Sequence, residues 1–592
     1  MADEAAEAVV KFRRTCGVKP AIPTLTHTMF LSNLDLIWLH INNFQMLFFY
    51  SPSPLVDHSS SVEGLKKSLS SVLVHFYPLA GRLKKGESGR MEVDCNDGGV
   101  EFTEASINIP FQDLERDGFR RKHYFQKLVH EVGLSGEENH SGPLLSIQVS
   151  KKTGGMCIGT TLHHAMADGN SFWHFMTSWA ECSRGITIAK PPQLDRTFVR
   201  RGEKNPLSIS YKAHEIVSSE ITEATVFKLV AEDPEHLQQS GSGYVENPKE
   251  TLEKWVDPGM KTEVIYTTFF FTEEIIQDLK RRSGASSSFV AVAAQFWRCV
   301  MRAREVPLEE TVCFLLLADC RGRVNPPLLP TYFGNCLYMG LAQTTANTLI
   351  NSPISFAADV IHQLINSCYE ETQMDHLIDW AELPNRNFID LIREAGWEYG
   401  TNVISSPRFR VYDIDYGWGK PLEVQTATMN EIGAMFLSCA KDGGKSILVS
   451  TCLPQHQMEV LHRFLFLVGE NRSVLLSAYP VKPETLIKLP VNLRKNVDSV
   501  VLLPSASSHR GNARDLKAYQ RDLKTGEIDS TTVMVEIELQ AVLKMSRTSI
   551  VKPAFPTPPS TMFLSSLDLL LLPFNSSQRL LFYKLPPAND YS

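Results

Sequence analysis

The sequence contains one pattern whose residue types and spacing could support acid–base chemistry, namely His164-Ala-Met-Ala-Asp168-Gly169. Histidine has an unperturbed pKa of about 6.5, so its neutral imidazole can accept a proton from a hydroxyl or an amine near neutral pH. The nearby Asp168 invites interpretation as the partner in a catalytic dyad. The alternative is a buried, hydrogen-bonded histidine beside a turn aspartate, because so short a pattern often arises by chance.

The surrounding elements place this pattern between a strand and a helix. Two apolar runs, Leu144–Val149 and Met156–Leu162, flank the turn sequence KKTGG and predict a hairpin that leads directly into the histidines. After Gly169, apolar side chains recur at helical spacing and predict a helix with one buried face. That face consists of Phe172, Phe175, Met176 and Trp179. Open α/β sheets commonly bind ligands where a strand meets a helix.

Two adjacent histidines precede the helix, and only one has the H-x-x-x-D spacing. Neighbouring residues on an extended segment point in opposite directions. We therefore assign the chemistry to His164 and a packing role to His163.

Helical and extended patterns alternate along the rest of the chain. One amphipathic helix is predicted before Pro78, and its buried positions are Leu65, Leu69, Val72 and Phe76. Ser286–Arg304 is typical of a serine-capped helix, and Cys313–Leu317 is typical of a short buried strand. This alternation predicts the α/β fold class.

The composition excludes several functions. The 592 residues include 59 Lys and Arg against 66 Asp and Glu, a formal charge of −7, so the chain lacks the basic excess of nucleic-acid-binding proteins. The eleven cysteines form no C-x-x-C pair, so we expect free thiols in a reducing compartment and no metal centre. A membrane-spanning helix needs about 18 consecutive apolar residues, and every apolar run in the sequence is much shorter. The N-terminus also lacks the apolar stretch of a secretory signal. We therefore expect a cytoplasmic protein.

One segment occurs twice. Lys19–Tyr50 recurs without a gap as Lys552–Tyr583, at an offset of 533, and nineteen of the 32 paired positions are identical. We interpret residues 533–592 as the truncated start of a second copy. Two origins remain open. Two adjacent, related reading frames could be joined in one gene model, or the segment could be a fused regulatory element that competes with Lys19–Tyr50 for its docking position.

Several motifs occur together in a fixed order. They are LSSVLVHFYPLAGRL before the histidines, the H-x-x-x-D pattern, FWHFMTSWAE just after it, DCRGRVNPPLLPTYFGN at Asp319–Asn335 and DYGWGKP at Asp415–Pro421. With these motifs, the span from about Val10 to Val468 resembles the plant BAHD family of coenzyme A-dependent acyltransferases. The family's DFGWG motif has Phe where this chain has Tyr416, a change that adds one hydroxyl group.

The resemblance implies a domain organisation. We expect two similar chloramphenicol-acetyltransferase-like domains, each a mixed β-sheet with flanking helices, and an active-site tunnel between them. The N-terminal acyltransferase domain is expected at residues 1–190, a crossover linker at 191–225 and the C-terminal acyltransferase domain at 226–475. A disordered linker is expected at 476–532, followed by the truncated repeat at 533–592.

The resemblance also implies roles for individual residues. His164 is the implied general base, and Asp168 is implied to support its loop through an ion pair with an arginine. Arg321 and Arg323 are the two candidates for that arginine, with a preference for Arg323. The structural motif that matches DFGWG consists of Asp415, Tyr416, Gly417, Trp418 and Gly419. Arg408 is a candidate for contact with an anionic group of a substrate.

The implied reaction moves an acyl group from acyl-coenzyme A to an alcohol or amine of a plant specialised metabolite. Acyl-coenzyme A is a co-substrate, and no permanently bound cofactor is implied. The sequence LSNLDL at Leu31–Leu36 resembles hydroxycinnamoyl-transferring members, so hydroxycinnamoyl donors are favoured over acetyl or malonyl donors. We expect a monomer that has no nucleic-acid or membrane partner.

Two other functions remain open. The histidine motif also fits condensation domains of nonribosomal peptide synthetases, which act on carrier-bound substrates. Those domains have adenylation and carrier domains as neighbours, which the flanks of this chain do not resemble. The other alternative is a catalytically silent, ligand-binding member of the fold.

Overall fold

The computed structural model describes most of the chain up to residue 465 and short strands beyond it. The described residues are 9–39, 43–51, 58–87, 89–130, 132, 142–152, 154–199, 210–217, 223–232, 264–381, 399–428, 432–465, 473–475, 501–504, 533–538, 572–574 and 578–580. Contacts divide the chain into two compact units, Met1–Leu461 and His462–Ser592.

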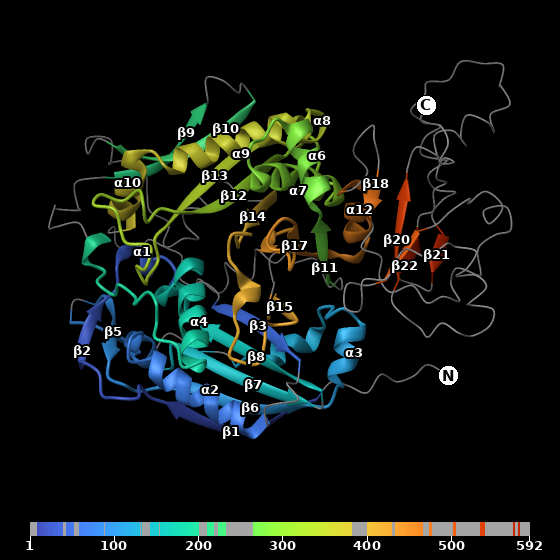
Figure 1. Ribbon diagram of the computed structural model, residues 1–592. Helices are drawn as coiled ribbons and strands as arrows, with labels where there is room; N and C mark the ends of the chain where they lie inside the picture. The colour runs from blue at the N-terminus through green and yellow to red at the C-terminus, as the bar shows by residue number, and fades with distance from the viewer. Residues whose placement is uncertain are drawn as a thin grey trace, which may run out of the picture. The chain divides into compact units, whose positions relative to one another are not determined.

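A six-stranded sheet belongs mainly to the N-terminal half of the first unit (Figure 1). Its strand order is β1 (Val10–Val18), β6 (Val100–Ile107), β7 (Leu145–Lys152), β8 (Gly155–Leu162), β3 (Phe44–Tyr50) and β15 (Glu423–Thr426). Neighbouring strands are antiparallel, except for the parallel pair β6 and β7. Because β15 comes from the second half of the sequence and pairs with β3, both halves contribute to this sheet.

Both faces of this sheet are covered by helices. These are α2 (His58–Val72) and α4 (Gly169–Ser183) on one face, and α3 (Phe111–Arg116) and the 3-10 segment η2 (His123–Leu128) on the other. Along β3, Phe48 and Tyr50 pack toward α2 and α4, whereas Leu47 and Phe49 pack toward α3 and η2. Side chains alternate along a strand, so a strand that is covered on both sides is apolar at successive positions.

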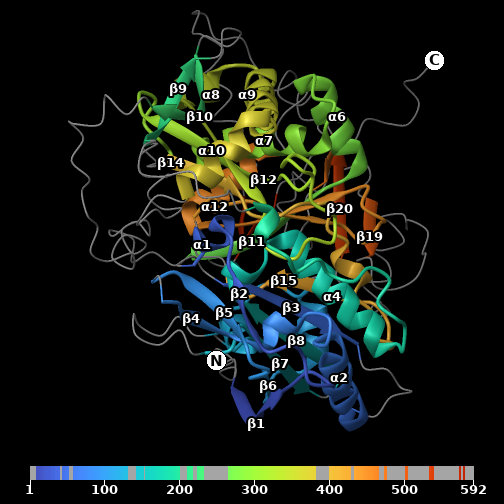
Figure 2. The same ribbon diagram turned by 90° about the vertical axis from the view of Figure 1, so that its left-hand side faces the viewer.

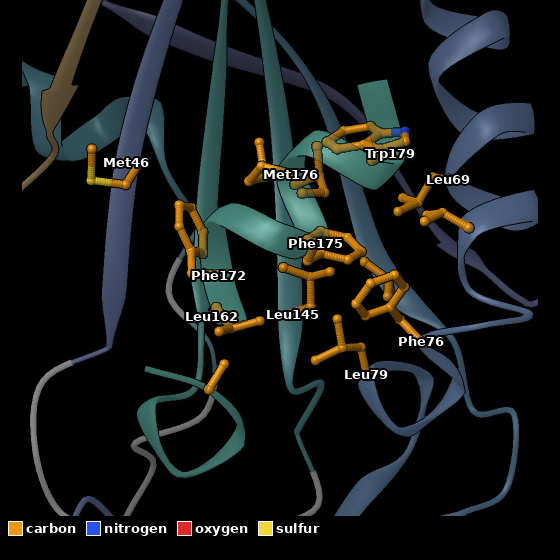
Figure 3. Packing of buried hydrophobic residues seen from close by; sticks show 14 of the residues in the cluster. Met46, Leu69, Phe76, Leu79, Leu145, Leu162, Phe172, Phe175, Met176 and Trp179 are labelled. Atoms are coloured by element: carbon orange, nitrogen blue, oxygen red, sulfur yellow. The ribbon is translucent and has the colours of Figure 1, made fainter. Parts of the chain in front are cut away.

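The predicted helical core is confirmed. Helices α2 and α4 lie side by side over the sheet (Figures 1 and 2). The four α4 residues predicted to be buried are fully buried, and Figure 3 shows Phe175 and Trp179 beside Leu69 and Phe76. The α2 helix ends at Val72, earlier than predicted, although the Phe76 N–H still donates to the Val72 carbonyl at 3.1 Å.

A five-stranded sheet and its helices form much of the second half (Figure 2). The strand order is β14 (Tyr399–Val403), β12 (Thr311–Asp319), β13 (Leu337–Thr345), β10 (Ala224–Glu232) and β9 (Ser210–Val217). The associated helices are α6 (Glu273–Ser283), α7 (Ser288–Ala303), α8 (Ala346–Asn351), α9 (Ile354–Cys368) and α10 (Glu371–Ala381). Helix α7 and strand β12 confirm two predicted elements. The N-cap residue is a serine, Ser287, as predicted, but its side chain makes no capping hydrogen bond.

The remaining described elements of the first unit form two three-stranded sheets and several helical segments. One small sheet contains β2 (His27–Phe30), β5 (Met91–Cys95) and β4 (Arg82–Lys85), and another contains β11 (Val264–Phe271), β17 (Ile447–Pro454) and β16 (Phe436–Cys439). The short helical segments are α1 (Asn33–Leu36), η1 (Tyr77–Ala80), η3 (His164–Met166), η4 (Thr197–Val199) and η7 (Val411–Asp413), and α12 (Gln455–Leu465) follows β17. Strands and helices are mixed along both halves of the first unit, which confirms the α/β class.

Beyond the end of α12, the described part of the second unit consists of short strands. β20 (Val533–Glu538) pairs with β18 (Ser473–Leu475) and β19 (Val501–Pro504), and β21 (Leu572–Phe574) pairs with β22 (Gln578–Leu580). Apart from these strands, the predicted linker and repeat lie outside the described residues. Across the described ranges, no helix combines the length and the apolar content that crossing a membrane requires.

Candidate active site

His164 lies in the turn between the predicted hairpin and the predicted helix. Strand β8 ends at Leu162, His164 begins η3, and Asp168 is the N-cap residue of α4. The predicted strand–turn–helix arrangement is confirmed. The short pattern therefore occupies the structural position that the surrounding sequence indicated.

Two aromatic side chains enclose the imidazole of His164. The indole of Trp38 stacks on it, with the ring centroids 4.2 Å apart and an interplanar angle of 7°. The ring of Phe44, on the strand paired with β8, lies at a centroid distance of 4.5 Å and an angle of 40°. His164 is 7% exposed. Water is therefore largely excluded from the faces of the ring.

This environment keeps His164 neutral at physiological pH. Burial lowers the pKa of His164 to about 4, because the imidazolium form loses hydration. The backbone of His164 itself, followed by Asp168, Asn335 and Asp35, opposes this lowering of the pKa more weakly by favouring the charged form. The Nδ1 atom makes no hydrogen bond within the described part of the chain. A neutral, buried imidazole can accept a proton, and nearby carboxylates can then stabilise the imidazolium.

Asp168 is bonded to the scaffold rather than to His164. Its Oδ1 atom accepts the Ser171 amide at 2.9 Å, and its Oδ2 atom accepts the Cys336 amide at 3.0 Å. The guanidinium of Arg321 reaches both oxygens, with distances of 2.9 Å to Oδ1 and 2.8 Å to Oδ2. These donors bond to both oxygens of the carboxylate, so the described contacts of Asp168 join the start of α4 to the segment that follows β12. They do not form a dyad with His164.

The preference for Arg323 as the partner of Asp168 is wrong. Arg321 is buried, and it also donates to the Gly334 carbonyl at 3.0 Å. The side chain of Arg323 is exposed and lies over the ring of Tyr369, 4.9 Å from its centroid. Arg323 lies two residues after Arg321, and its side chain contacts Tyr369 instead of the start of α4.

A second buried ion pair lies on the other side of the turn, and sequence analysis missed it. The Nη1 atom of Arg196 is 2.7 Å from the Oδ2 atom of Asp35, and both side chains are buried. The Oδ1 atom of Asp35 accepts the backbone amide of Asn335 at 2.9 Å and its side-chain amide at 3.0 Å. Asn335 ends one of the motifs that identified the family, and Asp35 lies in the LSNLDL sequence that favoured hydroxycinnamoyl donors. Arg196 lies in the predicted crossover linker without a recognisable signal.

The neighbouring His163 is also buried, and its Nδ1 atom accepts the Ala165 amide at 3.2 Å. The packing role of His163 stays a prediction.

The loop Asp415–Gly419 closes on its own first residue. The Oδ1 atom of Asp415 accepts the amides of Gly417 at 2.8 Å and Gly419 at 2.9 Å. Both glycines have positive φ values, 106° and 107°, which favour glycine. The Trp418 ring lies edge-on to Tyr50, with centroids 6.2 Å apart. These contacts fix the shape of the loop, and its structural role stays a prediction.

The hydroxyl of Tyr416 is expected to affect the stability of the protein, which the sequence did not indicate. The side chain is fully buried between Trp179 and Tyr50, and its hydroxyl has no hydrogen-bond partner in the described structure. A buried polar group without a partner costs free energy.

Tyr416→Phe is therefore expected to stabilise the protein, by on the order of 1 kcal/mol. The matched control is Tyr50→Phe, because the buried hydroxyl of Tyr50 donates to the Ile414 carbonyl at 2.9 Å. That substitution should destabilise the protein by a similar amount. Thermal and urea unfolding measure both variants, and the same sign of change in the two would contradict this explanation.

Arg408, the candidate for an anionic contact, is exposed on the turn before η7. Its amide donates to the Ser406 hydroxyl at 3.3 Å. Among the described hydrogen bonds and ion pairs, none joins the side chain of Arg408 to another predicted site residue.

Comparison with known proteins shows which family the chain resembles. A family model described as "Transferase family" matches residues 8–464. BAHD acyltransferase DCR of Arabidopsis thaliana is 33% identical over 477 residues, which cover 76% of this chain and 91% of that protein. A hydroxycinnamoyltransferase of Narcissus pseudonarcissus is 28% identical over 464 residues, which cover 77% of this chain and 99% of that protein.

Solved structures share the fold. Vinorine synthase aligns with a TM-score of 0.56 and 21% identity, covering 76% of this chain and 96% of its own. TRI101 of F. sporotrichioides, complexed with coenzyme A and T-2, aligns with a TM-score of 0.55 and 17% identity, covering 74% and 97%.

The family match includes the histidine turn, Arg321 and the Asp415–Gly419 loop, and the relatives support coenzyme A-dependent acyl transfer over the carrier-dependent alternative. The chain belongs to the BAHD acyltransferase family.

Proposed function

We propose that this protein transfers a hydroxycinnamoyl group from coenzyme A to an alcohol or amine, with His164 as the general base. The observation that supports this most is the buried, neutral imidazole in a turn held by ion pairs, within a chain of this family. Relatives named hydroxycinnamoyltransferase and shikimate O-hydroxycinnamoyltransferase support the choice of acyl group. Acetyl and malonyl donors remain the competing classes.

In the proposed reaction, the neutral imidazole of His164 acts as the base in a site from which water is largely excluded. The imidazole removes the proton from the acceptor as its oxygen or nitrogen attacks the thioester carbonyl carbon. The tetrahedral intermediate collapses with cleavage of the carbon–sulfur bond. The departing thiolate of coenzyme A receives the proton from the imidazolium, which restores the base. No covalent acyl-enzyme is required.

The proposal is tested with a panel of donors and acceptors. Hydroxycinnamoyl-, acetyl- and malonyl-coenzyme A are each combined with shikimate, quinate, a polyamine and a fatty alcohol. Release of the coenzyme A thiol and the mass of the acylated product are followed. We expect acceptor-dependent release, fastest with hydroxycinnamoyl donors. A full panel without thiol release would instead favour a silent, ligand-binding member of the fold.

Removal of the C-terminal region should leave catalysis intact. The repeat Lys552–Tyr583 matches only the opening segment of the catalytic unit and has no copy of the histidine or GWG motif. A chain that ends after Ala478 is expected to have the turnover and melting temperature of the full chain. A marked loss or gain in either quantity would show that the repeat acts on the catalytic unit.

A further inference from the structure

The turn from His164 to Asp168 lies between two buried aspartate–arginine pairs. Asp168 and Arg321 hold its C-terminal end, where α4 begins. Asp35 and Arg196 lie at its N-terminal part. Successive backbone amides of one segment connect the two pairs, because Asn335 donates to Asp35 at 2.9 Å and Cys336 donates to Asp168 at 3.0 Å.

The second pair holds the carbonyl groups of the histidine turn. The Nη2 atom of Arg196 donates to the Met166 carbonyl at 2.8 Å, and its Nη1 atom donates to the Ala165 carbonyl at 3.4 Å. The side-chain amide of Asn335 donates to the carbonyl of His164 at 2.9 Å. Three consecutive carbonyls are therefore fixed by groups that are themselves bonded to Asp35.

The carboxylate of Asp35 is held in one orientation. Its Oδ2 atom accepts the Ser32 amide at 2.9 Å and the Ser32 hydroxyl at 2.5 Å, while the arginine and asparagine donors occupy its other positions. Ser32 and Asp35 form the capping box of α1. Trp38, the next residue after the C-cap of this short helix, stacks on the imidazole. One segment thus contacts the ring of the histidine directly and is linked to its backbone carbonyl through Asn335.

We propose that Asp35 and Arg196 are positioning residues that fix His164 for proton transfer. This inference rests on the proposed function of His164 as the base. By fixing the peptide planes of residues 164–166, the pair sets the direction in which the imidazole leaves the backbone. A base that is misplaced by about 1 Å can lose about 100-fold in rate, so this pair acts on turnover through His164.

Arg196→Lys and Asp35→Asn test the proposal. Lysine keeps the positive charge but cannot match the fork with which Arg196 reaches Asp35 and two carbonyls at once. Asparagine keeps the size of Asp35 and removes its charge. Each variant is expected to lose about 10- to 100-fold in kcat, with KM for the acyl donor within about threefold of wild type. The double variant should be no slower than the slower single variant, because both belong to one unit.

Arg298→Lys is the matched control. Arg298 is 9% exposed and donates to the carbonyls of Leu349, Ile350 and Ser352 at 2.5–3.0 Å, so it is a comparable buried arginine in another part of the first unit. This variant should lose melting temperature but keep kcat. All assays are performed at a temperature at which circular dichroism shows each variant folded, and Arg196→Lys decides the test if Asp35→Asn does not fold.

The pH dependence separates positioning from a general loss of structure. Opening of the turn should admit water to His164 and move the acid limb of kcat/KM upward in the Arg196 variant but not in the Arg298 variant. An unchanged kcat and an unchanged acid limb in folded Arg196→Lys would overturn the inference, as would an equal loss of kcat in Arg298→Lys. His164→Ala is measured in parallel. If it retains wild-type turnover, the proposed base is wrong, whereas an inactive His164→Ala beside fully active Asp35 and Arg196 variants refutes only the positioning role.

Discussion

Replacement of His164 by alanine is expected to lower kcat by about 10²–10⁴-fold, which is the usual contribution of a positioned general base. The protein should remain folded, because the imidazole makes ring contacts with Trp38 and Phe44 but its Nδ1 atom forms no hydrogen bond within the described chain. Initial rates of thiol release measure the loss, and circular dichroism verifies the fold.

His163→Ala is the control for this substitution. His163 is also buried and is adjacent in sequence, and its Nδ1 atom accepts the Ala165 amide. Its replacement should have a much smaller effect on turnover. Equal effects of the two substitutions would show that the wrong histidine was assigned, and so would retention of more than about a tenth of the wild-type rate by His164→Ala.

Replacement of Asp168 by asparagine is expected to lower both the melting temperature and the turnover. The substitution leaves the buried guanidinium of Arg321 without its main counter-charge, and breaking a buried pair in this way costs about 3–5 kcal/mol. It also weakens the acceptor for the Ser171 and Cys336 amides. Thermal unfolding and steady-state rates, measured on the same preparation, test the two effects together.

Asp319→Asn provides a matched control, because Asp319 contacts the same Nη1 atom of Arg321 at 2.9 Å. Its side chain is 49% exposed, so its loss should change the free energy of unfolding by about 0–1 kcal/mol. If Asp168→Asn kept full stability and lost all activity, Asp168 would act directly on the chemistry and the scaffold role would be wrong.

Local patterns in the sequence were sufficient to predict the elements around His164. Apolar alternation, a turn sequence and helical spacing each depend on residues that are close along the chain. Strand β8, the turn and helix α4 therefore appear where the pattern placed them. The assignment of His164 within this frame needed the additional motifs that identify the family.

Contacts between distant segments could not be predicted in the same way. Arg321 and Arg323 lie two residues apart, and only the path of the chain after β12 brings Arg321 to Asp168. Asp35, Arg196 and Asn335 come from three segments that share no periodicity. The pairing of β15 with β3 could not be predicted either, because β15 has only four residues and its partner is far away in the sequence.

The burial of His164 also determines how stability and activity should respond to acid. Its pKa in the folded protein, about 4, is below the unfolded value of about 6.5. Between these values the unfolded chain binds a proton that the folded protein does not bind, so the contribution of His164 to stability decreases as the pH falls through this window. Rates in this range are therefore compared only where the protein is shown to be folded.

The most direct test of His164 as a buried neutral base is the pH dependence of kcat/KM, which reports the pKa of the essential base in the free enzyme. The acyl donor that is fastest in the panel is varied at a fixed acceptor concentration well below the KM of the acceptor, so that the rate reports the free enzyme. We expect constant kcat/KM from neutral pH down to about 5 and a decline centred near 4, at the pKa to which burial lowers His164. A decline centred at or above the ordinary imidazole pKa of about 6.5 would contradict the account.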